Sequence, residues 1–148
     1  GLGCRALPHR SAEVQQILQR HGVFLAFENH PNEPTPEVVL EKIGHGQYPN
    51  ISTTFDTGWW GTHNYPVLDA INILKDYIML VHLKNVVEPG THIAARYDEG
   101  CLDLKPVVQR LRDINYTGWI SLEYEPLDRE PTEDCRSYLQ VATSWWNS

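Results

Sequence analysis

Four short apolar runs, each ended by a side chain that can bind a cation, most constrain what this chain can fold into. The runs cover residues 23–28, 51–56, 78–82 and 119–123. Their length and their content of β-branched and aromatic residues are typical of buried strands, and helix-like stretches separate them. This alternation predicts βα units that share a parallel sheet.

The residues that end the four runs form a set of potential metal ligands, namely Glu28, Asp56, His82 and Glu123. In sheets of βα units, ligands bind at the carboxyl ends of the strands, where these side chains would meet. Three carboxylates and one imidazole suit a hard divalent ion, and we expect Mn²⁺, with Mg²⁺, Co²⁺, Fe²⁺ or Zn²⁺ as alternatives. Each residue alone could be a helix cap, a surface ion pair or a core histidine. Four at successive strand ends favour a metal site.

Four βα units make half of an eight-stranded barrel, whose full length is roughly 250 residues. We therefore expect an α/β fold in which residues 1–148 form a single domain, a (βα)4 portion of a TIM barrel. An open half-barrel would expose apolar sheet edges and inner faces. The sequence thus predicts either a missing N-terminal half-barrel or a partner chain, as in a homodimer.

Composition excludes several classes of function. A net charge of -7, without a cluster of Lys and Arg, disfavours nucleic acid as a partner. Cys4, Cys101 and Cys135 are odd in number and widely spaced, which indicates no disulfide framework and a cytoplasmic setting. No run is long enough to span a membrane, and no signal segment opens the chain. Because Met79 is the only methionine, we expect a fragment or a trimmed product.

Capping residues and periodicity predict the helices. Ser11 and Gly22 bound the first helix. Thr35 is the expected cap of the second helix, with Pro36 at its first position, and Asp103 is the expected cap of the fourth. The expected helices cover residues 12–21, 36–43, 66–74, 104–115 and 132–145. An irregular lead-in is expected at 1–10 and an aromatic loop at 57–65. The long segment 83–103 lacks periodicity, which is typical of a lid or substrate loop.

Five further residues are expected to contact a substrate: His30, Trp59, His63, Lys84 and Arg96. The histidines could bond substrate hydroxyls or be ordinary loop residues. Trp59 and Trp60 could form an apolar wall against a sugar ring, or simply pack on the rim of the barrel. Lys84 could bind a substrate oxygen or be a solvated lysine. Glu125 could support the ligands or anchor its loop.

The ligand set indicates a class of reaction. An octahedral ion with four protein ligands keeps two positions for adjacent oxygens of a hydroxy-ketone, whose carbonyl it would polarise to stabilise an enediolate. Glu28 and Glu123 could remove and return a proton on either face of the carbon. The sequence therefore predicts a metal-dependent isomerase or epimerase that acts on a hydroxy-ketone.

Several stretches carry a resemblance to a known family. The chain reads LAFENH at 25–30, TFDTG at 54–58, VHLKN at 81–85 and GWISLEYE at 118–125. Here it resembles the xylose isomerase-like TIM barrel superfamily, specifically the sugar phosphate isomerase/epimerase group with its ketose 3-epimerases, hydroxypyruvate isomerase and inosose dehydratase. The resemblance implies strands five to eight of the barrel. It also implies that Glu28, Asp56, His82 and Glu123 occupy the metal-ligand positions, with the two glutamates as the acid/base pair.

The chain departs from this pattern in one place, and other functions stay open. Many members carry a histidine three residues after the strand-six aspartate, where this chain has Trp59, and His63 lies further on. Endonuclease IV, of the same superfamily, needs Asp-x-x-His and Asp-x-His motifs that do not occur here, so DNA repair is disfavoured. An inosose-type dehydratase and a catalytically incomplete half-barrel that acts as a binding or assembly module are the alternatives.

Overall fold

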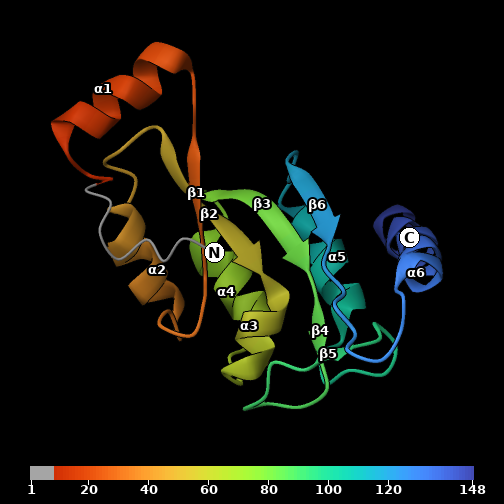
Figure 1. Ribbon diagram of the computed structural model, residues 1–148. Coiled ribbons are helices and arrows are strands. Elements are labelled where there is room, and N and C mark those ends of the chain that lie inside the picture. The colour runs from red at the N-terminus through yellow and green to blue at the C-terminus, as the bar shows by residue number, and fades with distance from the viewer. Residues whose placement is uncertain (1–8) are drawn as a thin grey trace.

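A four-stranded parallel sheet forms the centre of the molecule (Figure 1). The computed structural model describes residues 9–148, so Cys4 and most of the expected lead-in at 1–10 lie outside the described residues. The sheet has the order β1-β2-β3-β6, and all of its pairings are parallel. Its strands are β1 (Leu25–Glu28), β2 (Ile51–Asp56), β3 (Ile78–Leu83) and β6 (Trp119–Leu122). The predicted α/β fold with four βα units of a TIM barrel is confirmed.

Helices alternate with the strands, and five of the six in residues 9–148 lie at the predicted places. The helices are α1 (Ala12–His21), α2 (Pro36–Ile43), α3 (Thr57–Thr62), α4 (Val67–Leu74), α5 (Leu104–Asp113) and α6 (Thr132–Asn147). The hydroxyl of Ser11 accepts the N–H of Val14, and Gly22 ends α1 at a φ of 61°, which glycine adopts without strain. Asp103 caps α5 as predicted, whereas Thr35 makes no side-chain capping bond to α2. None of the helices in 9–148 is long and apolar enough to cross a membrane.

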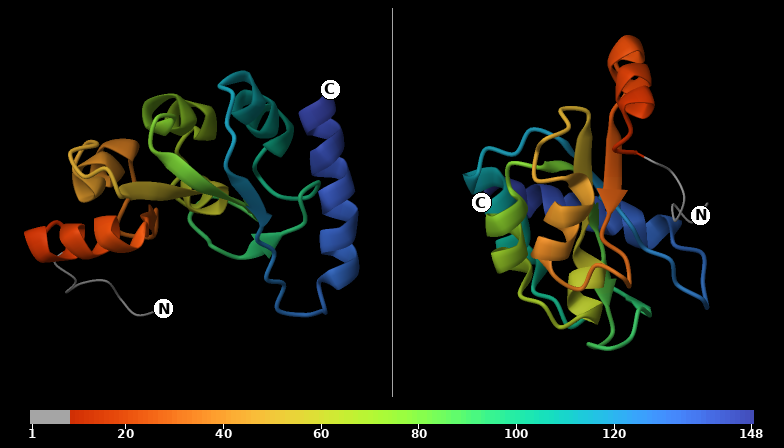
Figure 2. Two further views of the ribbon diagram at one scale, coloured as in Figure 1. Left: turned by 90° about the horizontal axis from the view of Figure 1, so that it is seen from above. Right: turned by 90° about the vertical axis from the view of Figure 1, so that its left-hand side faces the viewer.

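The sheet curves into an open arc, with helices α2, α4 and α5 along its convex side (Figure 2). Phe55, Val81 and Leu83 point to that side and are fully buried, as are Ile71 and Leu111 from the covering helices. Alternate strand residues therefore build a dry core against the helices. Among the described residues, β1 and β6 each pair on one side only.

The segment after Asp56 is a helix, so the prediction of a loop at 57–65 is wrong for its first six residues. The carboxylate of Asp56 accepts the N–H of Trp59 at 2.7 Å and so caps α3. Trp60 is 0% exposed and packs against Phe55 and Tyr65. A six-residue helix is unstable in isolation, so the cap by Asp56 and the burial of Trp60 stabilise it. The suggested wall role of Trp60 is also wrong, because Trp60 belongs to the core.

The segment 83–103 has more structure than its lack of periodicity suggested. The strands β4 (Asn85–Val86) and β5 (Ala94–Ala95) form an antiparallel pair. The amide of Asn85, which is 0% exposed, bonds the backbone of Tyr97 and Leu102. These bonds hold the base of the segment against the end of the sheet.

The strand register places all four strand-end residues on one face. Glu28 is level with Thr54, which lies two residues before Asp56, and Asp56 is level with His82. His82 in turn is level with Ser121, two residues before Glu123. Offsets of zero or two residues preserve the face of a strand to which a side chain points. The four side chains therefore line the face opposite the helix-covered core.

A register shift in the pairing of β2 with β3 contributes to this arrangement. Thr53 is level with Ile78 but Thr54 is level with Leu80, so Met79 is the extra residue of a bulge. Without the shift, Val81 rather than His82 would lie level with Asp56. The bulge thus brings the imidazole to the carboxylates.

Candidate metal centre

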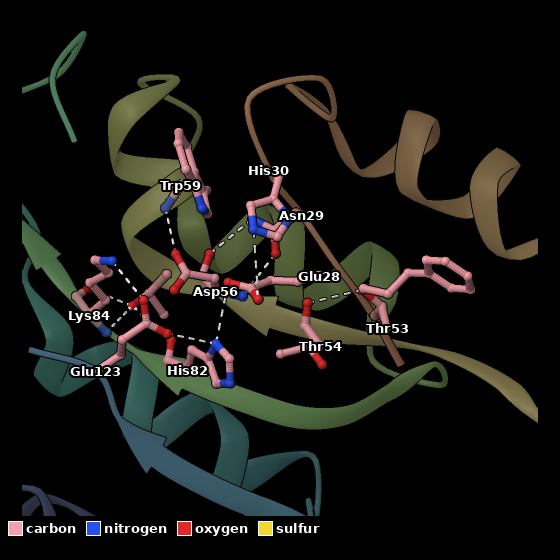
Figure 3. A network of polar contacts seen from close by, with 12 residues as sticks. Glu28, Asn29, His30, Thr53, Thr54, Asp56, Trp59, His82, Lys84 and Glu123 are labelled. Carbon is pink, nitrogen blue, oxygen red and sulfur yellow. Dashed lines mark hydrogen bonds and ion pairs between the residues drawn. The ribbon is translucent and has the colours of Figure 1, made fainter. Parts of the chain in front are cut away.

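Four potential metal ligands meet at the carboxyl end of the sheet (Figure 3). Glu28 ends β1, Asp56 ends β2, His82 lies near the end of β3 and Glu123 follows β6 directly. One donor atom from each lies within 4.8 Å of the others. The Nδ1 atom of His82 is 2.8 Å from Oε2 of Glu123 and 3.3 Å from Oε1 of Glu28. The predicted set of ligands is brought together.

Two buried atoms of this cluster lack a hydrogen-bond partner within the described chain. They are Oδ2 of Asp56, whose residue is 0% exposed, and Nδ1 of His82, whose short contacts do not have the geometry of a hydrogen bond. A buried polar atom without a partner is costly unless an ion or water satisfies it. Oxygen donors with one imidazole nitrogen, all within 4.8 Å of one another, fit a hard divalent cation.

The charges in the cluster perturb one another strongly. Burial raises the pKa of Asp56 to about 7, although the N–H of Trp59 opposes this effect. Close contact with Glu123, and then with Glu28, raises the pKa of His82 to about 10. Contact with His82, reinforced by Lys84, lowers the pKa of Glu123 to about 2. Strong mutual perturbation of this kind is typical of functional sites.

Asn29 supports the centre, although the sequence analysis did not single it out. Its side chain is 1% exposed and bonds both backbone groups of Asp56, with Nδ2 donating to the carbonyl at 3.0 Å and Oδ1 accepting the N–H at 2.8 Å. It therefore fixes the end of β1 to the end of β2. An amide residue directly after a strand-end glutamate is the only local signal for this role.

Three of the expected substrate contacts lie beside the cluster. The ring of Trp59 is 5.8 Å from that of His30 and 6.2 Å from that of His63, between centroids. Nε2 of His30 is 3.9 Å from a carboxylate oxygen of Glu28, and His63 approaches the carbonyl of His30 at 3.4 Å. The three aromatic rings thus form one group at the rim.

His92, which the sequence analysis did not select, covers one face of Trp59. The two rings are stacked at 3.5 Å with an angle of 10° between their planes. Nδ1 of His92 is 2.8 Å from the hydroxyl of Thr62, and the N–H of Gly90 donates to the carbonyl of Thr62 at 2.8 Å. The tip of the segment 83–103 is therefore attached to α3, and His92 covers one face of Trp59.

Lys84 and Arg96 are both paired with carboxylates in the described chain. Lys84 is 3% exposed, so it is not a solvated lysine, and its ammonium group pairs with Glu123 at 2.7 Å and with Glu125 at 3.2 Å. Arg96 instead pairs with carboxylates of its own loop and of α6, namely Asp98, Glu99 and Asp134. None of these partners of Arg96 belongs to the cluster of four ligands. Substrate binding by either residue stays a prediction.

Comparison with known proteins places this geometry in a wider group. A family model described as "Xylose isomerase-like TIM barrel" matches residues 5–141. Uncharacterized protein MJ1311 of Methanocaldococcus jannaschii is 28% identical over 140 residues, covering 88% of this chain and 47% of that protein. Inosose dehydratase of Geobacillus kaustophilus is 24% identical over 135 residues, covering 79% and 43%. The chain thus spans about half the length of the curated relatives it matches.

A solved structure shows the same arrangement of elements. The crystal structure of a D-tagatose 3-epimerase-like protein superposes with a TM-score of 0.76 at 24% sequence identity. The match covers 92% of this chain and 52% of that protein. This likeness establishes that the four βα units have the fold of half a barrel.

Proposed function

Because the chain belongs to the xylose isomerase-like TIM barrel family, we propose that its strand-end cluster is the metal centre of a sugar isomerase or epimerase. The substrate would be a small sugar, sugar phosphate or polyol with a carbonyl next to a hydroxyl-bearing carbon. One observation carries this proposal, namely the convergence of Glu28, Asp56, His82 and Glu123 within 4.8 Å around an unpaired buried oxygen of Asp56.

The four ligands divide into two functional kinds. Asp56 and His82, on the two central strands, would hold the ion, which we propose to be Mn²⁺ and which supplies a Lewis acid for the carbonyl oxygen. Glu28 and Glu123 come from the two outer strands, so their carboxylates approach from opposite sides of the cluster. Each would move a proton to or from the carbon next to the carbonyl, in addition to binding the ion.

The groups around the ligands would select and orient the substrate. His30 and His63 would bond its hydroxyls, and Trp59 would pack against its carbon skeleton on the side that His92 does not cover. Arg96 would reach it only after leaving its carboxylate partners. The assignments of His30, His63 and Trp59 follow from their position beside the cluster.

A dehydratase is the second candidate, and the identity of 24% to inosose dehydratase favours it. Loss of water and isomerisation both begin with removal of the proton next to a carbonyl. The same two glutamates would serve either outcome. The difference would lie in whether a hydroxyl leaves the neighbouring carbon.

Activity would further need a cover for the inner face of the sheet. The chain spans about half of its relatives, and Trp119, on the same face as the ligands, is 83% exposed. We propose that an N-terminal half-barrel, or a second copy in a homodimer, completes the site. An incomplete half-barrel would serve only as a binding or assembly module, because misplacement near 1 Å costs about a hundredfold in rate.

Calorimetric titration with Mn²⁺ tests the metal centre directly. We expect about one ion per chain, with binding lost or strongly weakened in Glu123→Gln. Glu133→Gln, at an exposed position of α6, is the matched control and is expected to bind as the wild type does. No binding to the folded wild type would refute the centre.

Deuterium exchange then separates the candidate reactions. The Mn²⁺-loaded protein would be incubated in D₂O with D-fructose, D-tagatose or an inosose, and the products followed by nuclear magnetic resonance and mass spectrometry. Deuterium at the carbon next to the carbonyl, in a product that has not lost water, indicates an isomerase or epimerase. A product that has lost water indicates the dehydratase. If the completed barrel causes neither deuterium incorporation nor loss of water, the proposed activity is contradicted.

A further inference from the structure

The ammonium group of Lys84 is buried beside Glu123, one of the candidate metal ligands. Its side chain is 4% exposed, and Nζ donates to Oε1 of Glu123 at 2.7 Å (Figure 3). Its second partner, Glu125 at 3.2 Å, has a side chain that is 73% exposed, so solvent screens that contact. A buried charge needs a close partner, and Glu123 is the partner that is itself half-buried.

The backbone and side-chain path of Lys84 are fixed by the start of α3. Its N–H donates to the hydroxyl of Thr57 at 2.8 Å, and that hydroxyl lies 2.6 Å from the carbonyl of Lys84. A Cβ atom at Gly58 would lie 2.8 Å from Cγ and 2.9 Å from Cδ of the lysine. The absence of a side chain at Gly58 therefore leaves the space through which the lysine stem reaches Glu123.

The contact with Lys84 divides the two oxygens of Glu123 between different partners. Oε1 accepts the ammonium, while Oε2 lies 2.8 Å from Nδ1 of His82 and so faces the centre of the cluster. Only one oxygen of Glu123 is then free for an ion. The ammonium also makes the surroundings of the carboxylates less negative.

We propose that Lys84 is a positioning residue that restricts Glu123 to one-oxygen ligation and so keeps coordination positions open for substrate oxygens. This inference rests on the proposed metal centre. It gives Lys84 a role through Glu123 in place of the direct substrate contact expected from the sequence. It also explains why Gly58 is the second residue of α3, because a larger residue there would displace the lysine.

Bound Mn²⁺ itself provides the test, without any substrate. Water-proton relaxation counts the water molecules on the ion, and titration gives its dissociation constant. In Lys84→Met, the released Oε1 of Glu123 is expected to join the ion. The number of bound waters should fall by about one, and the dissociation constant should fall roughly tenfold, because the site has lost a positive charge. Lys75→Met, at the exposed end of α4, is the control.

Gly58→Ala is a second variant that removes no charge. Its new methyl group is expected to displace the lysine stem and to cause the same loss of bound water, which keeps the proposal testable if Lys84→Met fails to fold. An unchanged water count in the folded variants, with Mn²⁺ bound to the wild type and weakened in Glu123→Gln, would overturn the role of Lys84 alone. Absence of Mn²⁺ binding to the wild type would overturn both this role and the metal centre.

Discussion

The two faces of the sheet differ in how completely this chain covers them. On the convex face, Phe55, Val81 and Leu83 are 0% exposed beneath the helices. On the opposite face, which carries the metal-ligand candidates, Trp119 is 83% exposed although it lies on a strand. The exposure of so large a side chain shows that the described residues do not cover this part of the sheet. The chain therefore completes its helix-covered core but leaves the site-bearing face open.

The largest expected effect comes from the covered face. Phe55→Ala would remove a fully buried ring that packs against Trp60, and should lower the free energy of unfolding by about 3–5 kcal/mol. Urea denaturation followed by circular dichroism measures this loss. A loss below about 1 kcal/mol would mean that this core is not the main source of stability.

The site-bearing face should gain stability from an ion. Mn²⁺ at about 100 times its dissociation constant should add about 2.7 kcal/mol to the free energy of unfolding, because the ion binds the folded chain. Asp56→Asn should abolish that gain, since it replaces a central carboxylate of the cluster. Thermal unfolding with and without Mn²⁺ gives the comparison. An equal gain in the variant would locate the ion elsewhere.

A smaller, pH-dependent effect is expected at the rim of the open face. Burial of His92, with a contribution from Lys84, lowers its pKa from 6.5 to about 4. Between these values the unfolded chain binds a proton that the folded chain does not, so stability falls as the pH drops from 6.5 towards 4. After allowance for solvent screening, His92 should account for about 1 kcal/mol of this fall.

His92→Gln should remove that part of the pH dependence, measured by urea denaturation at pH 7 and pH 4.5. His45→Gln, at an exposed position, is the control for the loss of an imidazole. If the free energy of unfolding of His92→Gln depends on pH as that of the wild type does, the stacked imidazole does not contribute to the pH dependence.

The smallest effect is expected at Trp119. Because its side chain is largely in solvent, Trp119→Ala should change the free energy of unfolding of this chain by less than about 0.5 kcal/mol. The contrast with Phe55→Ala measures the difference between the faces. A loss above about 2 kcal/mol, or one that grows with protein concentration, would show that a second copy covers the open face.

Much of the fold could be predicted because its signals are local. Ser11 and Gly22 bound α1, and Asp103 caps α5, through contacts within a few residues. The apolar run at 51–56 coincides with β2, and the run at 78–82 differs from β3 by one residue. The convergence of the four ligands could also be predicted, since parallel strands bring their carboxyl ends to one edge.

Other features depend on contacts between distant segments. The core buries Trp60 and so supports α3, and Lys84 is a partner of Glu123 rather than a surface charge. Asn29 joins two strand ends that are far apart in the sequence. The local sequence does not specify the partner in such pairs.

The sequence by itself determined which residues would stand at the strand ends, because hydrophobic runs and capping residues act over a few positions. The tertiary structure decided how those ends meet. The bulge at Met79 sets the register that aligns His82 with Asp56, and the space at Gly58 lets Lys84 reach Glu123. Register and close packing depend on the partner segment as much as on the segment itself, which is why they appear only when the chain is folded.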